Sequence, residues 1–328
     1  MNINRRRLLQ LAAAAGSSAS LPASLFAQSP YPNQALKLIV PFTAGSTTDV
    51  IARVVGERLQ QYLGQPCVVD NRAGAGGTIG ASVVAGSAAD GYMALVHSAG
   101  HVANAALYPA LKYDTLKDFT PVTMLVSMPN VFVVTPGKGF TSLQDLVQKV
   151  KAEPGKYTYG SSGNGSGSHI AAEKFRLITG IDARHIPYRG TPQALTDVMS
   201  GLVDWFLCPL ALATPLIKDG RLTALSIGGA KRSPLLPNVP TIAESGFGNT
   251  DHTFWVGMFV SSKTPDAVVT RLHAETVRAL NSDEVRTRLD KLGADAAPMP
   301  QRQFAQLVSD ETVETTTLIK QAGIRLDG

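Results

Sequence analysis

Residues 35–64 read ALKLIVPFTAGSTTDVIARVVGERLQQYLG, and this stretch encodes a buried strand followed by an amphipathic helix. Residues 35–42 form a near-continuous apolar run, which is typical of a strand covered on both faces of its sheet. From Val50 to Leu59 the apolar residues recur at helical spacing, and Gly64 provides a C-terminal stop. A strand, a polar loop and a helix in this order predict half of a parallel βαβ unit.

The same alternation continues along the chain. We expect strands at residues 66–72 (PCVVDNR) and 91–98 (GYMALVHS). Between them, the glycine-rich segment at residues 73–87 starts a helix near Thr78. Strands that alternate with helices predict a parallel sheet with right-handed crossovers.

A second unit of the same kind begins after residue 128. Its strand at residues 156–162 leads into a run of glycine and serine and then into a helix at residues 169–180. A further apolar strand is expected within residues 253–265, and two amphipathic helices at residues 266–282 and 300–323 form the tail. The apolar sides of these helices must pack on an apolar surface, and we expect the first unit to provide that surface.

The predicted fold class is therefore α/β with two lobes, each a mostly parallel sheet flanked by helices. The first lobe comprises residues 28–128 and 254–328, and the second comprises residues 129–253. In open parallel sheets, ligands bind beyond the carboxyl ends of the strands, where both glycine-rich loops are expected. Two lobes that face each other with such loops form a ligand cleft.

Residues 1–27 have the layout of an export signal. Arg5, Arg6 and Arg7 precede a short apolar stretch, and Ala27 marks the expected cleavage position. The arginines fit either a twin-arginine signal or a general secretory signal, and both alternatives stay open. In either case the sequence predicts a periplasmic protein.

Removal of the signal lowers the net charge. Of 30 basic residues, 27 remain against 25 acidic ones, so the mature chain is near +2 and gives no support for nucleic-acid or anionic-membrane binding.

Cys67 and Cys208 could pair in an oxidising compartment. Both lie in apolar runs far apart in the sequence, which favours two buried free thiols.

The glycine-rich loops do not match nucleotide or hydrolase motifs. A dinucleotide fingerprint needs a third glycine where Ile79 and Ser168 stand, and neither a phosphate-binding loop with lysine nor G-x-S-x-G is present. Small residues before a helix still favour an anion, because backbone N–H groups and the helix dipole point at it.

No zinc motif is expected. His97 and His101 are spaced i, i+4, but glycine interrupts them and no acidic residue is adjacent. We interpret them as loop histidines near the rim of the cleft. We predict no metal and no cofactor.

Several blocks together resemble a known family. LIVPFTAGSTTDVIARVV looks like the P-[FY]-x-x-G-G-x-x-D-x-x-A-R opening of the receptors of tripartite tricarboxylate transporters, also called Bug receptors. Further blocks match in order, among them YTYGSSGNGSGSHIAAEKF and HIPYRGTPQALTDVMSGLVDWFL, so the resemblance covers the whole mature chain. It implies the fold of type II periplasmic binding proteins and a permease of one small and one large membrane subunit. One departure is Ser46, where the family motif has its second glycine.

The resemblance implies that a ligand carboxylate is held between the loop after the first strand and the glycine- and serine-rich loop. On this sequence the implied ligand-binding residues are Gly45, Ser46, Thr47, Thr48, Asp49, Ser161, Ser162, Gly163, Asn164, Gly165 and Ser166, with His169 and Thr191 nearby. Asp49 either accepts from the ligand or complements the helix dipole. His169 either contacts the ligand or packs.

The expected ligand is a small organic acid held mainly by neutral donors, because neither loop contains arginine or lysine. Which acid is bound stays open. We expect a monomeric receptor without catalytic residues. The alternatives are a ligand-sensing receptor for a signalling partner and, less favoured, an exported hydrolase that uses a serine of the second loop.

Overall fold

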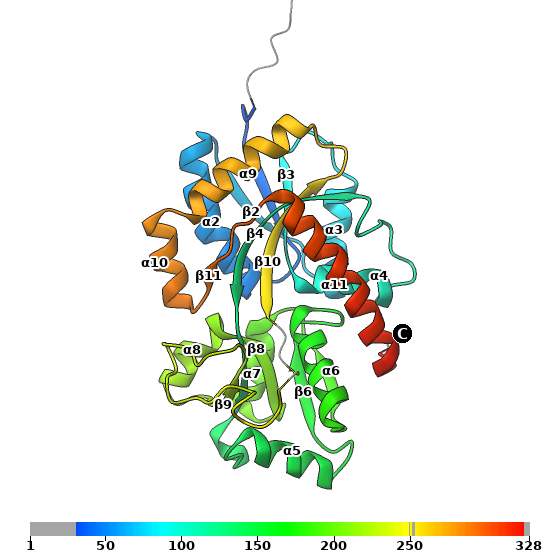
Figure 1. Ribbon diagram of the computed structural model, residues 1–328, viewed down its shortest axis with the longest axis vertical. Helices are drawn as coiled ribbons and strands as arrows, with labels where there is room; N and C mark the ends of the chain where they lie inside the picture. Colours follow the sequence, from blue (N-terminus) through cyan, green and yellow to red (C-terminus); the bar gives the residue numbers. More distant parts are fainter. Residues whose placement is uncertain (1–30, 249, 251–252, 325–328) are drawn as a thin grey trace, which may run out of the picture. The chain divides into compact units, whose positions relative to one another are not determined.

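The computed structural model describes residues 31–248, 250 and 253–324, and these residues build two separate β-sheets (Figure 1). The predicted export signal over residues 1–27 lies outside the described residues. We call the six-stranded sheet with its helices the first lobe, and the five-stranded sheet with its helices the second lobe. The residue boundaries given above for the lobes stay a prediction.

The first sheet has the strand order β11-β4-β10-β3-β1-β2. Its strands are β1 (Leu36–Val40), β2 (Cys67–Asn71), β3 (Met93–Ser98), β4 (Phe119–Met128), β10 (Phe254–Ser261) and β11 (Asp295–Ala296). Strand β1 pairs in parallel with β2 and β3, whereas β10 runs antiparallel to β3 and β4. The sheet is mixed because the chain returns from the second lobe in the opposite direction and inserts β10 between two earlier strands.

The second sheet has the order β7-β6-β8-β5-β9. Its strands are β5 (Asn130–Val134), β6 (Thr158–Ser161), β7 (Arg184–Pro187), β8 (Trp205–Pro209) and β9 (Thr223–Ile227). Strand β6 is parallel to β7 and β8, and β5 is antiparallel to β8 and β9. Pro129 alone separates β4 from β5, so the two sheets are joined there by a very short connection.

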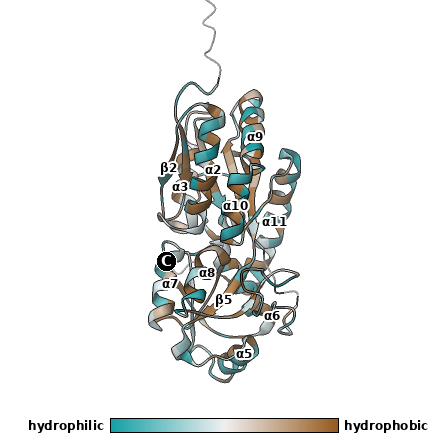
Figure 2. Cartoon of the chain, turned by 90° about the vertical axis from the view of Figure 1, so that its left-hand side faces the viewer, coloured by the Kyte–Doolittle hydropathy of each residue, from teal (hydrophilic) through white to brown (hydrophobic). Residues whose placement is uncertain are grey.

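Helices cover both sheets. They are α2 (Thr47–Leu63), α3 (Thr78–Ala85), α4 (Asn104–Leu107), α5 (Leu143–Ala152), α6 (Gly167–Thr179), α7 (Thr191–Ser200), α8 (Leu210–Lys218), α9 (Asp266–Leu280), α10 (Asp283–Leu292) and α11 (Gln301–Ala322). Short 3₁₀ turns are η1 (Ala75–Gly77), η2 (Ala99–Ala103) and η3 (Pro136–Lys138). Hydrophobic residues concentrate on the strands, while helices such as α2 and α10 carry hydrophilic stretches (Figure 2). No helix among the described residues combines the length and the hydropathy needed to cross a bilayer.

The tail contains three helices, where the sequence analysis expected two. The segment before Gly293 forms α10, with Ser282 as its N-cap and Gly293 as its left-handed C-cap. No helix was predicted here because the segment is mostly polar and charged, and α10 buries only two apolar residues, Val285 and Leu289. Helix α11 packs on β4 and η2 of the first lobe and also contacts α6 of the second.

Aromatic side chains fill each core. In the first lobe, Phe304 of α11 packs against Trp255 and Phe259 of β10, with ring centroids 5.6 and 5.3 Å apart. Both phenylalanines are fully buried, and burying each stabilises the fold by about 1.5–3 kcal/mol. Gly257 lies under the Phe304 ring, where a Cβ atom would be 2.3 Å from Cζ, so the close packing requires glycine.

Both cysteines are free thiols in the structure. Cys208 is fully buried in β8, as the sequence favoured, but Cys67 in β2 is half-buried rather than buried. Burial raises the pKa of Cys67 to about 11, so its thiol stays protonated at neutral pH.

Candidate functional site

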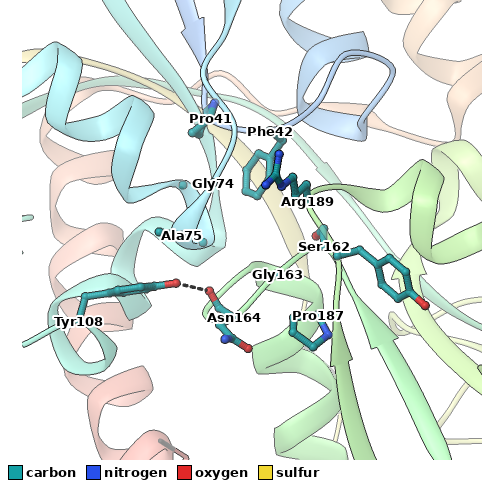
Figure 3. A pocket seen from close by; sticks show the side chains of 13 residues that line it. Pro41, Phe42, Gly74, Ala75, Tyr108, Ser162, Gly163, Asn164, Pro187 and Arg189 are labelled. Carbon is teal, nitrogen blue, oxygen red and sulfur yellow. Dashed lines mark hydrogen bonds between the residues drawn. The ribbon is translucent and has the colours of Figure 1, made fainter. Parts of the chain in front are cut away.

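A cavity of about 190 Å³ lies between the two lobes (Figure 3). Its walls come from the segments that follow β1, β2, β6 and β7. The lining residues are Pro41, Phe42, Gly74, Ala75, Gly76, Gly77 and Tyr108 from the first lobe, and Ser162, Gly163, Asn164, Pro187, Tyr188 and Arg189 from the second. These are the carboxyl ends of the parallel strands, the place where open α/β sheets bind ligands.

The second-lobe loop supplies three of the sequence-predicted residues to the cavity wall, Ser162, Gly163 and Asn164. Gly163 has φ = 123°, a backbone conformation that side chains with a Cβ rarely adopt. The other predicted residues of this loop, Ser161, Gly165 and Ser166, do not line the cavity.

The N-terminus of α6 shapes this loop. Ser166 is the N-cap, and its hydroxyl accepts from the N–H of His169. In turn, Nδ1 of His169 accepts from the N–H of Gly165 at 3.0 Å. His169 is buried, and burial lowers its pKa to about 4, so the ring is neutral and can accept this bond. The structure therefore gives His169 a role in fixing the loop.

A second histidine supports the same loop from below. The His185 ring stacks on His169 with centroids 4.0 Å apart, and its Nε2 lies 2.6 Å from the Ser161 hydroxyl. The same hydroxyl accepts from the N–H of Gly163 at 3.0 Å. A serine–histidine pair at this distance has the spacing of a nucleophile and its base. Ser161 is fully buried and does not line the cavity, so the pair holds the loop.

The first-strand loop is held together by Asp49. Its carboxylate accepts from Gly45 N–H, from Asn71 Nδ2 and from both Nε and a terminal nitrogen of Arg53, at 2.9–3.0 Å. Burial raises the pKa of Asp49, but the hydrogen bonds from Arg53, Gly45 and Asn71 outweigh it and bring the pKa below its ordinary value. Four protein donors occupy the buried carboxylate, and Asp49 does not line the cavity, so the geometry favours the organising role.

The other predicted residues of this loop are buried at the start of α2. Ser46 is the N-cap, and its hydroxyl accepts from the N–H of Asp49, while Thr47 and Thr48 are 2 % exposed. The residues from Gly45 to Asp49 do not line the cavity. The serine that replaces the family's glycine therefore caps a helix.

The loop after β1 meets the start of α7 across the lobes. The Thr43 hydroxyl lies 3.4 Å from Oε1 of Gln193, and a Cβ on Gly190 would be 2.2 Å from the same hydroxyl. Thr191, predicted as a cleft residue, is buried in the first turn of α7 and does not line the cavity.

The cavity is closed on another side by direct contact between the lobes. The Tyr108 hydroxyl donates to the carbonyl oxygen of Asn164 at 3.0 Å (Figure 3). Gly76 lies against the same carbonyl, where a Cβ would be 2.1 Å from the oxygen. Burial raises the pKa of Tyr108 to about 12, so its hydroxyl stays a donor. Tyr108 and the glycine-rich loop of residues 74–77 are thus one place where the first lobe contacts the second.

The histidines interpreted as residues of the cleft rim are in the first core, which corrects that prediction. His97 lies in β3 and His101 in η2, both fully buried, with ring centroids 5.0 Å apart. Burial lowers the pKa of His97 to about 3, and its Nδ1 lies 3.0 Å from the carbonyl oxygen of Ser98. His97 belongs to the strand predicted over residues 91–98, and this strand is covered by the core, so its side chain is buried and does not reach the rim of the cleft. Among the described residues, no cluster of three potential metal ligands is found.

Sequence reasoning missed Phe42, Tyr108 and Arg189, and it did not assign residues 74–77 to the cavity. The rule that ligands bind beyond parallel strands could have found the residues after β1, β2 and β7. Tyr108 follows no strand, and no local signal identifies it.

Two α/β lobes with a small cavity at the carboxyl ends of their parallel strands define a two-lobed solute-binding protein. The chain belongs to the tripartite tricarboxylate transporter family receptors, whose family model matches residues 51–324. This confirms the predicted family and fold class. The family consists of periplasmic binding proteins and not of enzymes.

Solved structures of relatives agree with this assignment. Periplasmic binding protein BugD is 30 % identical with a TM-score of 0.86, covering 90 % of this chain and 99 % of its own. The R. palustris protein Rpa4515, solved with adipate, is 34 % identical with a TM-score of 0.86 and the same coverages. MatC from Rhodopseudomonas palustris, solved with bound malate, is 33 % identical with a TM-score of 0.84, covering 88 % and 100 %.

Proposed function

We propose that this receptor captures a small organic acid in the cavity between its lobes and delivers it to a tripartite membrane permease. The observation that carries the proposal is the composition of the cavity wall. Among the described residues that line it, the one charged residue is a cation, Arg189. A cavity with an unopposed positive charge favours an anion.

The size of the cavity sets the size of the ligand. Its volume is about 190 Å³. This is below the ~300 Å³ at which pockets for drug-sized molecules begin. A short-chain acid fits this limit, and relatives solved with malate and adipate bind ligands of that size.

Backbone donors are available to a carboxylate at the same place. Within the part of the chain that the structure describes, the N–H groups of Gly74 and Asn164 have no hydrogen-bond partner. One comes from each lobe, so a ligand that accepts from both would favour the closed arrangement by its differential affinity. The residues predicted from the sequence lie at the starts of α2 and α6, and the dipoles of these two helices also favour an anion.

We further propose that the lobes comprise residues 28–128 with 254–328 and residues 129–253, and that they move about Pro129. Export would be directed by residues 1–27, with the receptor acting as a monomer in the periplasm. Its membrane partners would be one small and one large permease subunit.

The proposal is tested by calorimetric titration of the mature protein with malate, adipate, benzoate, glucose and adipamide. We expect one of the acids to bind with one-to-one stoichiometry, and glucose and the neutral diamide not to bind. Glucose or the neutral diamide as the tightest ligand would overturn the proposal. Hydrolysis of a carboxylic ester by the protein would instead favour the hydrolase alternative.

A further inference from the structure

A second cavity lies at the opposite edge of the two sheets from the ligand cavity. The ligand cavity lies beyond β1 and β2 of the first sheet and β6 and β7 of the second, whereas the second cavity is lined by Asp295 of β11 and by residues 228–235, which follow β9. In the two strand orders, β11 and β9 are the strands farthest from β2 and β7. Pro129, which connects the sheets, also lines the second cavity. We call it the hinge-side cavity.

Both lobes build the hinge-side cavity, and they touch beside it. Helix α10 of the first lobe contacts α8 of the second, and Figure 1 shows both on the left of the ribbon, with α3 and α4 on the right. Gly293, the C-cap of α10, lies against the second lobe, where a Cβ atom would be 2.7 Å from Cδ2 of Leu210 and 3.0 Å from Cδ1 of Leu235. Gly293 and Leu235 both line the cavity, so its shape depends on how the two lobes are placed.

The hinge-side cavity has the size of a small-molecule site. Its volume is about 750 Å³, against about 190 Å³ for the ligand cavity. Sites for small molecules have volumes of ~300–1,000 Å³ and are frequent at interfaces between domains. Apolar side chains line this cavity from both lobes, Met128 and Ala294 from the first and Pro234 and Leu235 from the second. The wall therefore suits a molecule with an apolar middle.

The two walls of the hinge-side cavity differ in charge. Asp290 and Asp295 line it from the first lobe, and Lys231 lines it from the second. These three side chains are exposed, and within the described residues none of them has a hydrogen-bond or ion-pair partner. Arg232 also lines the second-lobe wall, but it is paired with Glu244. A diacid would meet two carboxylates and a diamine would meet the lysine, so the walls favour a molecule with one ammonium and one carboxylate group.

We infer that the hinge-side cavity is a second binding site, which takes a short peptide with free termini, and that its occupation strengthens the binding of the acid. The ammonium group lies toward Asp290 and Asp295, and the carboxylate lies toward Lys231. A molecule that touches both walls stabilises the arrangement in which both are in place. In this arrangement Tyr108 donates to the Asn164 carbonyl at the ligand cavity, so each ligand favours the state that binds the other. The second site stands independently of the proposed function, whereas the coupling rests on it.

The test titrates trileucine and two derivatives calorimetrically into the mature protein. N-acetyl-trileucine lacks the ammonium group, and trileucine amide lacks the carboxylate. The proteins are the wild type, Lys231→Gln, the double variant Asp290→Asn with Asp295→Asn, and Lys218→Gln. Lys218 is the matched control, since it is an exposed lysine of α8 in the same lobe and does not line the cavity. All the substituted side chains are exposed, so the variants are expected to fold, and thermal unfolding of each checks this.

We expect trileucine to bind the wild type with one-to-one stoichiometry, and each derivative to bind about 2- to 5-fold more weakly, as loss of an exposed charge pair implies. Lys231→Gln should weaken trileucine and the N-acetyl form by a similar factor and leave the amide unchanged. The double variant should weaken trileucine and the amide and leave the N-acetyl form unchanged, and Lys218→Gln should match the wild type. With trileucine at saturation, the tightest of malate, adipate and benzoate should bind about 5-fold more tightly or better.

Three results overturn the inference. The first is that trileucine does not bind the wild type. The second is an equal loss for all three peptides in Lys231→Gln, which would mean that the lysine does not pair with the terminal carboxylate. The third is an acid Kd that trileucine leaves unchanged or raises, and a raised Kd would mean that the peptide competes for the ligand cavity. If none of the acids binds the wild type, the proposed function and the coupling fail, while the peptide titrations still decide whether the second site exists.

Discussion

Gly76→Ala should weaken ligand binding by preventing the lobes from closing fully. Gly76 is buried in the first-lobe loop, and a Cβ there would lie 2.1 Å from the carbonyl oxygen of Asn164 in the second lobe. Cβ atoms do not approach an oxygen this closely, and the obstacle is backbone, which cannot rotate away. The loops must separate, so the hydrogen bond from Tyr108 to the same carbonyl lengthens as well.

The magnitude follows from the cost of overpacking a well-packed contact, ~1–3 kcal/mol. This cost applies to the closed state and not to the open one, so Kd should rise by about 5- to 150-fold. The substitution also places a Cβ on a residue with φ = 61°, which costs ~1–2 kcal/mol of stability in both states. That second cost lowers Tm without changing affinity.

Gly139→Ala separates the two effects. Gly139 has φ = 66°, and a Cβ added there would have no neighbouring atom within 4 Å, so it shares the backbone strain without the contact between lobes. Both variants should lose a few degrees of Tm, but only Gly76→Ala should lose affinity in calorimetric titration with the tightest acid. Wild-type affinity in Gly76→Ala, or an equal loss in both variants, would refute the reasoning.

Three further predictions concern the supports of the site. Tyr108→Phe removes the hydrogen bond between the lobes and should raise Kd about 2- to 10-fold in the same titration, with unchanged Kd as the contrary result. Asp49→Ala leaves the donors of Gly45 and Asn71 unpaired, so urea denaturation should show a loss of ~1–3 kcal/mol, and wild-type stability would contradict this. Burial lowers the pKa of His169 to about 4 from 6.5, so the unfolded chain takes up this proton first as the pH falls. The contribution of the neutral His169 ring to the free energy of unfolding is therefore fully present above pH ~6.5. It is lost as the pH falls to ~4, and it amounts to about 3 kcal/mol. Denaturation of wild type and His169→Gln at a series of pH values should show a smaller slope in the variant, and equal slopes would count against the assignment.

The order of strands and helices could be predicted from the sequence because each unit is a local pattern. An apolar run, a polar loop and a helical periodicity sit next to one another in the chain, as in β1 and α2. Ser166 and the glycines before α6 are a local pattern that predicts the loop lining the cavity. The antiparallel insertion of β10 could not be predicted, since its neighbours β3 and β4 are set by the return of the chain from the second lobe.

The site was predicted only in part for a related reason. Sequence marks which loops start helices, but the residues nearest a helix start, such as Ser46 and Asp49, are used to hold the loop itself. The lining residues come a few positions earlier or from another loop, as with Phe42 and Arg189. Their position depends on how two lobes meet, which no local pattern encodes.

The central claim is that one small acid is held by both lobes together. Hydrogen–deuterium exchange of the mature protein, with and without whichever of malate and adipate binds more tightly, tests it most directly. We predict slower exchange at saturation in two separate segments, around residues 74–77 and around residues 162–165. Protection of one segment alone, or of neither segment while the acid is bound, would contradict capture between the lobes.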